Sequence, residues 1–288
     1  MDIFAQLIVN GFIAGSLYAL IAVSFSLLYG ATRFFHMAHG SFAVIAAYVV
    51  VYLHRTLELP FVFSVISGVV LSGLVGYVLF RTIYRPLRER GGSPMILLVA
   101  SLGVMIVIHS LLAITFSSNF TGLTKVLERT RFELLGASVS SHQIGIFFVS
   151  IVVSLLVFVL LEKTMFGKKI QAVSDDEEVA RVMGINANAV LSSVFFLSAA
   201  LAGLGGILTG VDTGVQPSMD LFFLLKAVIA AIIGGVGNVY GAFFAAFLVG
   251  IVENLGIWFI PSEWKDSIAF GLLILFLLVR PNGLLGKR

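Results

Sequence analysis

The sequence has few of the residues on which soluble or disulfide-bonded domains depend. Its 288 residues include no cysteine, which excludes disulfides, thiol catalysis and iron–sulfur ligation. Charged residues make up 11% of the chain, against about 25% in soluble domains. The net charge of +3 comes from a few loops, so no nucleic-acid partner is expected. This composition excludes an ordinary soluble domain.

Motifs for common catalytic and cofactor sites are also missing. The sequence contains no HExxH motif, no EF-hand loop and no plausible Ser/His/Asp set. The glycine-rich segment 234–238 lacks the Lys-Ser/Thr pair of a phosphate-binding loop and is most simply a tight cytoplasmic turn. We therefore expect no enzymatic activity, metal or cofactor in this chain. If ATP and magnesium drive its activity, separate ATPase chains must bind them.

Long apolar segments dominate instead. Hydrophobic residues make up 59% of the chain, and the mean hydropathy is +1.08. Segments of about 17 residues or more recur, each long enough to cross a bilayer. The first is about twice as long as a signal-peptide core and has no basic residue before it, so we expect a retained helix. The predicted spans are 3–30, 38–53, 61–80, 94–116, 143–161, 189–210, 221–237, 241–259 and 266–280.

The positions of the basic residues predict the topology. Cytoplasmic loops of membrane proteins are rich in Lys and Arg. Basic residues cluster after the third span, after the fifth span and at the end of the chain: Arg81, Arg85, Arg88, Arg90, Lys163, Lys168, Lys169, Arg181, Arg280, Lys287 and Arg288. We predict a single all-α, polytopic membrane domain over residues 1–288 with nine crossings, in a range of eight to ten. Its N-terminus and the loop at 117–141 are expected outside, and its C-terminus inside.

A polar segment at 162–188 interrupts the apolar spans. Within it, Ser174 and Glu177 have the spacing of a capping box, which predicts a helix start. Val179, Val182 and Met183 fall on one helical face, and Gly184 can end the helix in a left-handed conformation. We expect this short helix to bury its apolar face, either in the protein's own loops or against another protein. The candidate docking residues are Ser174, Asp175, Asp176, Glu177, Glu178, Val179, Ala180, Arg181, Val182, Met183 and Gly184.

Two charged residues lie inside predicted spans. Lys226 is about five residues from the outer end of the seventh span, and Glu253 about six from the outer end of the eighth. Unpaired charges at such depth cost a few kcal/mol or more. An intramembrane ion pair between them is the prediction. A water-facing lysine and a proton-coupling glutamate are the alternatives.

Histidines and glycines within the spans allow two readings each. His36 and His39, where the second span begins, are expected to be hydrogen-bonded at the membrane interface, with a role in a solute pathway as the alternative. His109 is expected to be an interhelical donor. Glycines such as Gly11 and Gly15 favour close helix packing, although they could also leave room for a solute or break a helix.

Several motifs together resemble the branched-chain amino acid ABC permeases of the LivH type. The matching segments are 10–20 (NGFIAGSLYAL), 38–40 (AHG), 195–203 (FFLSAALAG), 226–241 (KAVIAAIIGGVGNVYG) with Glu253, and 280–286 (RPNGLLG). Three departures affect the identity of the solute. His36 and Met37 stand where the family usually has Asn-Phe, Asn238 stands where serine is common, and the importer pattern EAAxxxG is reduced to Glu178-Val179-Ala180 with Gly184.

The resemblance implies an ABC importer permease fold in the inner (plasma) membrane of a prokaryote. It implies a second, LivM-like permease, two LivG/LivF-like ATPase subunits and an external solute-binding protein as partners. The expected solute is a branched-chain amino acid, with urea or a short amide as the alternative. Solute choice is expected to lie mainly in the binding protein, because the spans carry few ionic groups. The candidate pathway residues are Asn10, Gly15, Ser16, Tyr18, His39, Gly40 and Ser101.

Two functions of another class stay open on the sequence. A secondary transporter would use Glu253 as its proton or sodium carboxylate and would need no ATPase. A passive channel would use the glycine-lined spans as a pore. Both would act without the polar segment 162–188 as a docking element.

Overall fold

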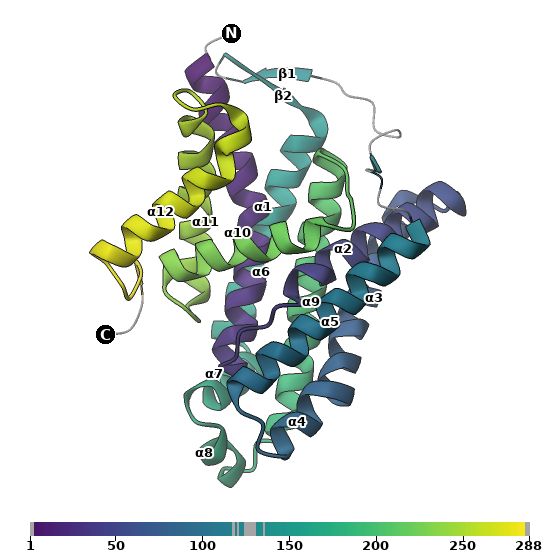
Figure 1. Cartoon of the computed structure of the whole chain (residues 1–288), viewed down its shortest axis with the longest axis vertical. Helices are drawn as coiled ribbons and strands as arrows, with labels where there is room; N and C mark the ends of the chain where they lie inside the picture. Colours follow the sequence, from purple (N-terminus) through teal and green to yellow (C-terminus); the bar gives the residue numbers. More distant parts are fainter. Residues whose placement is uncertain (1–2, 117–118, 120, 124–130, 135, 286–288) are drawn as a thin grey trace.

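One long helix, α1, forms the axis of the molecule, and shorter helices surround it (Figure 1). The computed structural model describes residues 3–116, 119, 121–123, 131–134 and 136–285. Helix α1 (Ile3–Thr32) is 30 residues long, which corresponds to about 45 Å of helix. It packs along α11 (Val239–Gly256), α9 (Ala187–Asp212) and α10 (Met219–Gly234). Because these three helices enclose it, most of the α1 surface is buried.

The remaining helices complete the bundle. Helix α2 (His39–Val50) continues as a π-helical turn (Val51–Thr56), and α3 (Phe61–Leu79) continues through another such turn (Phe80–Tyr84) into α4 (Arg85–Glu89). The others are α5 (Pro94–Phe116), α6 (Ser141–Lys163), α7 (Met165–Asp175), α8 (Glu177–Val182) and α12 (Lys265–Val279), preceded by a 3₁₀ turn at Ser262–Trp264.

Each predicted span corresponds to a helix. Among the described residues, six helical segments are long and apolar enough to cross a membrane: those of α1, α3–α4, α5, α6, α9 and α11. Helices α2, α10 and α12 have 12, 16 and 15 residues, and only about 20 apolar residues span a bilayer fully. The all-α membrane fold is therefore confirmed, while the count of nine crossings and the orientation stay predictions.

The loop at 117–141 contains more regular structure than expected. Strands β1 (Arg131–Leu134) and β2 (Ala137–Ser140) form an antiparallel pair, with Arg131 opposite Ser140. Ser140 then caps α6 through a capping box with Gln143. The two strands and the N-terminus lie at one end of the molecule, and α7 and α8 lie at the other (Figure 1).

Glycines hold the central helices close together. A Cβ atom at Gly206 on α9 would lie 2.1 Å from the Ala43 carbonyl oxygen on α2, and one at Gly250 on α11 would lie 2.5 Å from the Gly15 nitrogen on α1. Such contacts let helix backbones touch in lipid, where hydrophobic association gives no help. At Gly206 and Gly250, the glycines therefore allow close helix packing, as the sequence predicts.

We predict that Gly206→Ala lowers the thermal stability of the detergent-solubilised protein, measured by loss of the monodisperse peak in size-exclusion chromatography after heating. The added methyl group must push α2 and α9 apart, at a cost of about 1–3 kcal/mol. Gly103→Ala is the matched control, because a Cβ atom there meets nothing within 4 Å. Equal melting temperatures for the two variants would contradict the packing role of Gly206.

Candidate functional site

Four helices bring charged and polar side chains together beside α1. Tyr18 on α1 donates a hydrogen bond to Glu253 Oε2 on α11 at 2.9 Å, and Lys226 Nζ on α10 contacts Glu253 Oε1. Lys226 Nζ also lies 2.9 Å from Asp266 Oδ1 on α12. The sequence analysis pairs Lys226 with Glu253 alone, whereas the structure places the lysine between two carboxylates. Four helices are thereby tied to one ammonium group.

The surroundings of Lys226 compensate its burial. The Lys226 and Glu253 side chains are 3% and 0% exposed, so both charges have left water. Cation–π contacts replace part of the lost hydration of Lys226. Its Nζ lies 5.3 Å from the centre of the Tyr18 ring and 5.4 Å from that of the Phe222 ring. A buried pair of this kind is costly to break, because removal of one partner leaves the other charge uncompensated.

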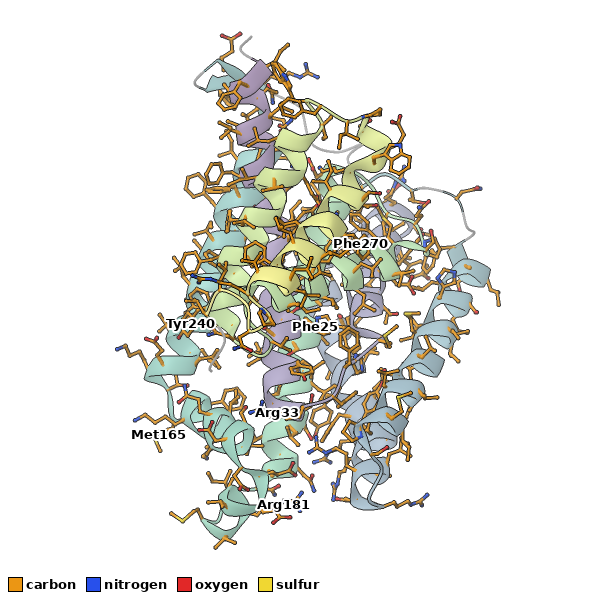
Figure 2. The ribbon with its side chains drawn as sticks, turned by 60° about the vertical axis from the view of Figure 1, so that its left-hand side comes forward. Phe25, Arg33, Met165, Arg181, Tyr240 and Phe270 are labelled. Carbon is orange, nitrogen blue, oxygen red and sulfur yellow. The ribbon has the colours of Figure 1, made fainter. Side chains whose placement is uncertain are left out.

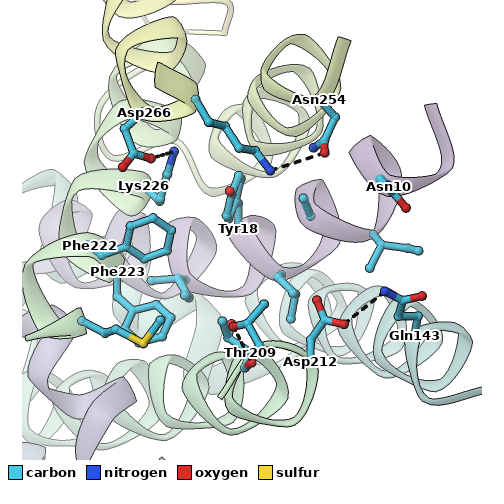
Figure 3. A pocket seen from close by; sticks show the side chains of 17 residues that line it. Asn10, Tyr18, Gln143, Thr209, Asp212, Phe222, Phe223, Lys226, Asn254 and Asp266 are labelled. Atoms are coloured by element: carbon cyan, nitrogen blue, oxygen red, sulfur yellow. Dashed lines mark hydrogen bonds and ion pairs between the residues drawn. The ribbon is translucent and has the colours of Figure 1, made fainter. Parts of the chain in front are cut away.

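A cavity of about 420 Å³ opens beside this cluster (Figure 3). One part of its wall is apolar and includes Leu17, Phe222 and Phe223. Its polar lining comes from α1, α6, α9, α10, α11 and α12: Asn10, Tyr18, Gln143, Thr209, Asp212, Thr213, Lys226, Asn254, Lys265 and Asp266. Glu253 is not part of the lining, since its carboxylate lies behind Lys226 and Tyr18.

A second cavity, of about 630 Å³, lies toward the other end of α1. It is lined by Ser26 and Arg33 near the end of α1, by Ser174 and Asp175 on α7, and by the turn before α11. That turn, 235–238, has positive φ values at Gly235 and Gly237, as the glycine-rich sequence predicts. The two cavities therefore lie along one helix, the first against residues 10–21 and the second against residues 26–30.

The structure separates the candidate pathway residues into two groups. Asn10 and Tyr18 line the first cavity. The other five lie outside both cavities, in helix contacts. Gly15 packs on Phe247, and a Cβ atom at Gly40 would lie 1.8 Å from the Asp220 carbonyl oxygen.

The serines and His39 are likewise structural in this arrangement. Ser16 donates to the Ile13 carbonyl oxygen at 2.7 Å. Ser101 accepts from the Met37 backbone N–H at 2.9 Å, which ties the chain before α2 to α5. His39 Nε2 lies 2.8 Å from Ser24 Oγ. Gly15, Ser16, His39, Gly40 and Ser101 are all enclosed by neighbouring helices, and their role in a solute pathway stays a prediction.

The histidines at the start of α2 are buried among neighbouring helices. His36 Nε2 lies 2.9 Å from the Tyr84 hydroxyl, and both His36 and His39 are surrounded by aromatic rings, Phe42 among them. The predicted hydrogen bonding of both histidines is confirmed, and their burial follows because α2 is enclosed by α3, α9 and α10. His109 lies at the contact of α5 and α10, with Nδ1 3.5 Å from Asp220 Oδ1.

The polar segment forms two helices, α7 and α8, at the end of the molecule (Figure 2). The predicted cap at Ser174 is wrong, because Ser174 and Asp175 still belong to α7. Asp176 caps α8 instead: its Oδ1 accepts from the N–H groups of Glu178 and Val179 at 2.9 and 3.0 Å. An aspartate next to the helix start competes successfully with a serine two residues earlier.

The end of α8 follows the sequence prediction. Gly184 has φ +81°, its N–H donates to the Arg181 carbonyl oxygen, and the Ile185 N–H donates to the Ala180 carbonyl oxygen. These are the two hydrogen bonds of a Schellman motif. Val182 and Met183 are 86% and 76% exposed, so the apolar tip is left uncovered by this chain.

Ion pairs fix α8 to the rest of the protein. Glu177 accepts from Arg181 Nη2 at 2.7 Å and contacts the Arg88 guanidinium on α4. Arg33 Nη2 donates to the Ser174 carbonyl oxygen at 2.9 Å, which joins α7 to the chain after α1. These contacts fix the position of α8, so that Val182 and Met183, the apolar tip, stay exposed at the end of the molecule.

Comparisons with known proteins assign the fold to a family. The family model "Branched-chain amino acid transport system / permease component" matches residues 7–277. The chain belongs to this permease family. It is 31% identical to the high-affinity branched-chain amino acid transport system permease protein BraD of Pseudomonas aeruginosa, over 99% of this chain and 96% of that one. It is 29% identical, with the same coverage, to LivH of Escherichia coli K12, a permease of the same description.

The solved structures agree on the fold. A chain of PsaBC from Streptococcus pneumoniae, in complex with Fab, superposes with a TM-score of 0.53 at 13% identity, covering 98% of this chain and 93% of that one. The permease therefore has an all-α ABC importer fold and is a transport subunit rather than an enzyme. Membership of the family implies ATPase and solute-binding partners.

Sequence reasoning missed three of the charged residues at the first cavity. Asp212, Lys265 and Asp266 stand at the ends of α9 and α12, where a charge is easily assigned to a loop. Their convergence with Lys226 corrects the expectation that the permease offers few ionic groups to a solute. The predicted topology could have identified them, because it places residues 212, 265 and 266 on the same side of the membrane.

We predict that Lys226→Met and Glu253→Gln each lower the stability of the permease in detergent, and that the double variant recovers part of the loss. Lys226→Met leaves the buried Glu253 carboxylate without a cation, at a cost of about 3–5 kcal/mol, whereas Glu253→Gln leaves Lys226 paired with Asp266 alone and should cost less. Asp266→Asn is the milder control, because the Asp266 side chain is 59% exposed. The measurement is a double-mutant cycle on the heat-induced loss of monodisperse protein, and strictly additive losses would argue against the pair.

Proposed function

We propose that this permease imports branched-chain amino acids across the inner membrane of a prokaryote, as one of two permease subunits in an ATP-driven assembly. The observation that carries the proposal is the match over nearly the whole chain to BraD and LivH, whose names give this solute class. A second, LivM-like permease, two LivG/LivF-like ATPases that bind ATP and magnesium, and an external binding protein complete the assembly. The motifs at 226–241 and 280–286 support the same solute class.

The two ends of the molecule would face different partners. We infer that the end with the N-terminus, β1 and β2 faces outward and receives solute, and that α7 and α8 face the cytoplasm. Basic residues support this orientation, since Arg81, Arg88 and Lys168 all belong to the segments at the α8 end. The segment 162–188 would then be the coupling element, and the apolar tip of α8 its contact with an ATPase.

The ion-coupled alternative receives less support. A carboxylate that binds and releases protons during transport needs access to water or to the solute. Glu253 has no exposed side-chain surface and is held by Lys226 and Tyr18. Its contacts fit a fixed structural anion that holds the lysine in place.

The proposal predicts different behaviour for the isolated permease and the full assembly. The purified chain alone in liposomes should neither hydrolyse ATP nor accumulate leucine under a proton or sodium gradient. With the second permease, both ATPases and loaded binding protein, leucine uptake should appear and should be blocked by vanadate. Urea or a short amide replaces leucine as the test solute in parallel vesicles. Gradient-driven accumulation by the isolated chain would falsify the importer proposal.

The coupling role of α8 has its own test. Val182→Asp places a charge on the apolar tip, and Gly184→Val forces a β-branched residue into a left-handed conformation. We expect each variant to lose at least tenfold in leucine uptake and to retain less ATPase on purification, with membrane insertion unchanged. Arg90→Gln, which is exposed at the same end of the molecule but lies outside the segment 162–188, is the control. Normal uptake with normal ATPase co-purification in both variants would refute the docking role.

A further inference from the structure

Among the described residues, the cavity beside α1 is lined by a lysine without a carboxylate partner and by a carboxylate without a lysine or arginine partner. Lys265 Nζ on α12 contacts Asn254 Oδ1 at 3.3 Å, and no carboxylate lies within 4.0 Å of it among the described residues. Asp212 Oδ1 on α9 accepts from Gln143 Nε2 at 3.2 Å and lies 3.6 Å from His142 Nε2. Within the described part of the chain, Asp212 has no lysine or arginine partner. Lys226 differs from both, because two carboxylates already hold it.

The two unpaired charges lie on opposite walls. Figure 3 shows Asp212 and its bond to Gln143 on one side of the cavity, and Asn254, which contacts Lys265, on the other. The space between them therefore has a positive wall and a negative wall. A ligand that carries both charges could satisfy both walls at once.

An apolar surface lies beside these walls. Phe222 and Phe223 form it together with Leu17 and Ile21, and Figure 3 places the two phenylalanines next to the Lys226–Asp266 pair. The cavity volume of about 420 Å³ falls within the range of about 300–1,000 Å³ that small-molecule sites occupy. An aliphatic side chain of a few carbons has both room and apolar contacts there.

We propose that this cavity is a binding site for a zwitterionic α-amino acid with an aliphatic side chain. The solute carboxylate pairs with Lys265, its ammonium pairs with Asp212, and its side chain packs on Phe222 and Phe223. The inference rests on the proposed function and adds to it a site in the permease that selects the solute. A zwitterion loses its hydration on leaving water, so a site must offer both charges. Urea and simple amides carry neither charge and would leave both walls unpaired.

The site is tested with the purified, full-length permease in lipid nanodiscs, by saturation-transfer NMR, which detects weak binding. Three probes separate the two walls: leucine, 4-methylpentanoate, which lacks the ammonium, and 3-methylbutylamine, which lacks the carboxylate. Lys265→Met should weaken leucine and 4-methylpentanoate at least tenfold and leave 3-methylbutylamine unchanged. Asp212→Asn should weaken leucine and 3-methylbutylamine and leave 4-methylpentanoate unchanged. Lys168→Met and Glu263→Gln are exposed controls outside the cavity and should bind like the native protein.

Uptake by the full assembly distinguishes failure of the site from failure of the function. If the native assembly imports leucine and both cavity variants bind and import it normally, the site is wrong while the importer proposal stands. Leucine uptake without any leucine signal on the native permease would also overturn the site. If the native assembly takes up urea or an amide but no leucine, both proposals fall. Loss of leucine binding with the split between the two analogues supports the site, and a monodisperse elution profile shows that each variant is folded.

Discussion

The ammonium group of Lys226 determines how the helices are arranged in the half of the molecule that contains the N-terminus, β1 and β2. Its two carboxylate partners come from α11 and α12, and Tyr18 of α1 completes the set by bonding Glu253. In a low-dielectric interior, each of these groups would be costly if left alone. The charges therefore fix the relative positions of four helices, and the cavity beside them follows from that geometry.

Close backbone contact also holds neighbouring helices together. Between α2 and α9, and between α1 and α11, glycine removes the side chain that would hold two helices apart. Lipid gives apolar helices no reason to associate, so short-range packing must supply the attraction. Polar anchoring around Lys226 and tight packing around Gly206 thus act in different regions, and both leave α1 enclosed.

The two ends of the permease present different chemistry to their surroundings. The cavity near β2 and the start of α12 offers charges of both signs next to aromatic rings, which suits a small zwitterion. At the other end, α8 exposes a few apolar side chains and is held in place by the ion pairs of Glu177 with Arg88 and Arg181. Such a surface is suited to contact with another protein. The proposed solute site and the proposed coupling helix therefore lie near opposite ends of α1.

The sequence by itself determined the membrane class and the position of each apolar helix, because hydropathy is a local property. It also determined the end of α8, since glycine adopts a left-handed conformation easily, and the pairing of Lys226 with Glu253, since an unpaired charge in a membrane span is costly. Motifs alone also indicated the family. Tertiary structure decided what depends on convergence: Asp266 joins Lys226, while Lys265 and Asp212 face one cavity from helices more than 50 residues apart in the chain. It also placed His39, Gly40 and Ser101 in buried helix contacts, since burial is a property of neighbours that no single segment contains.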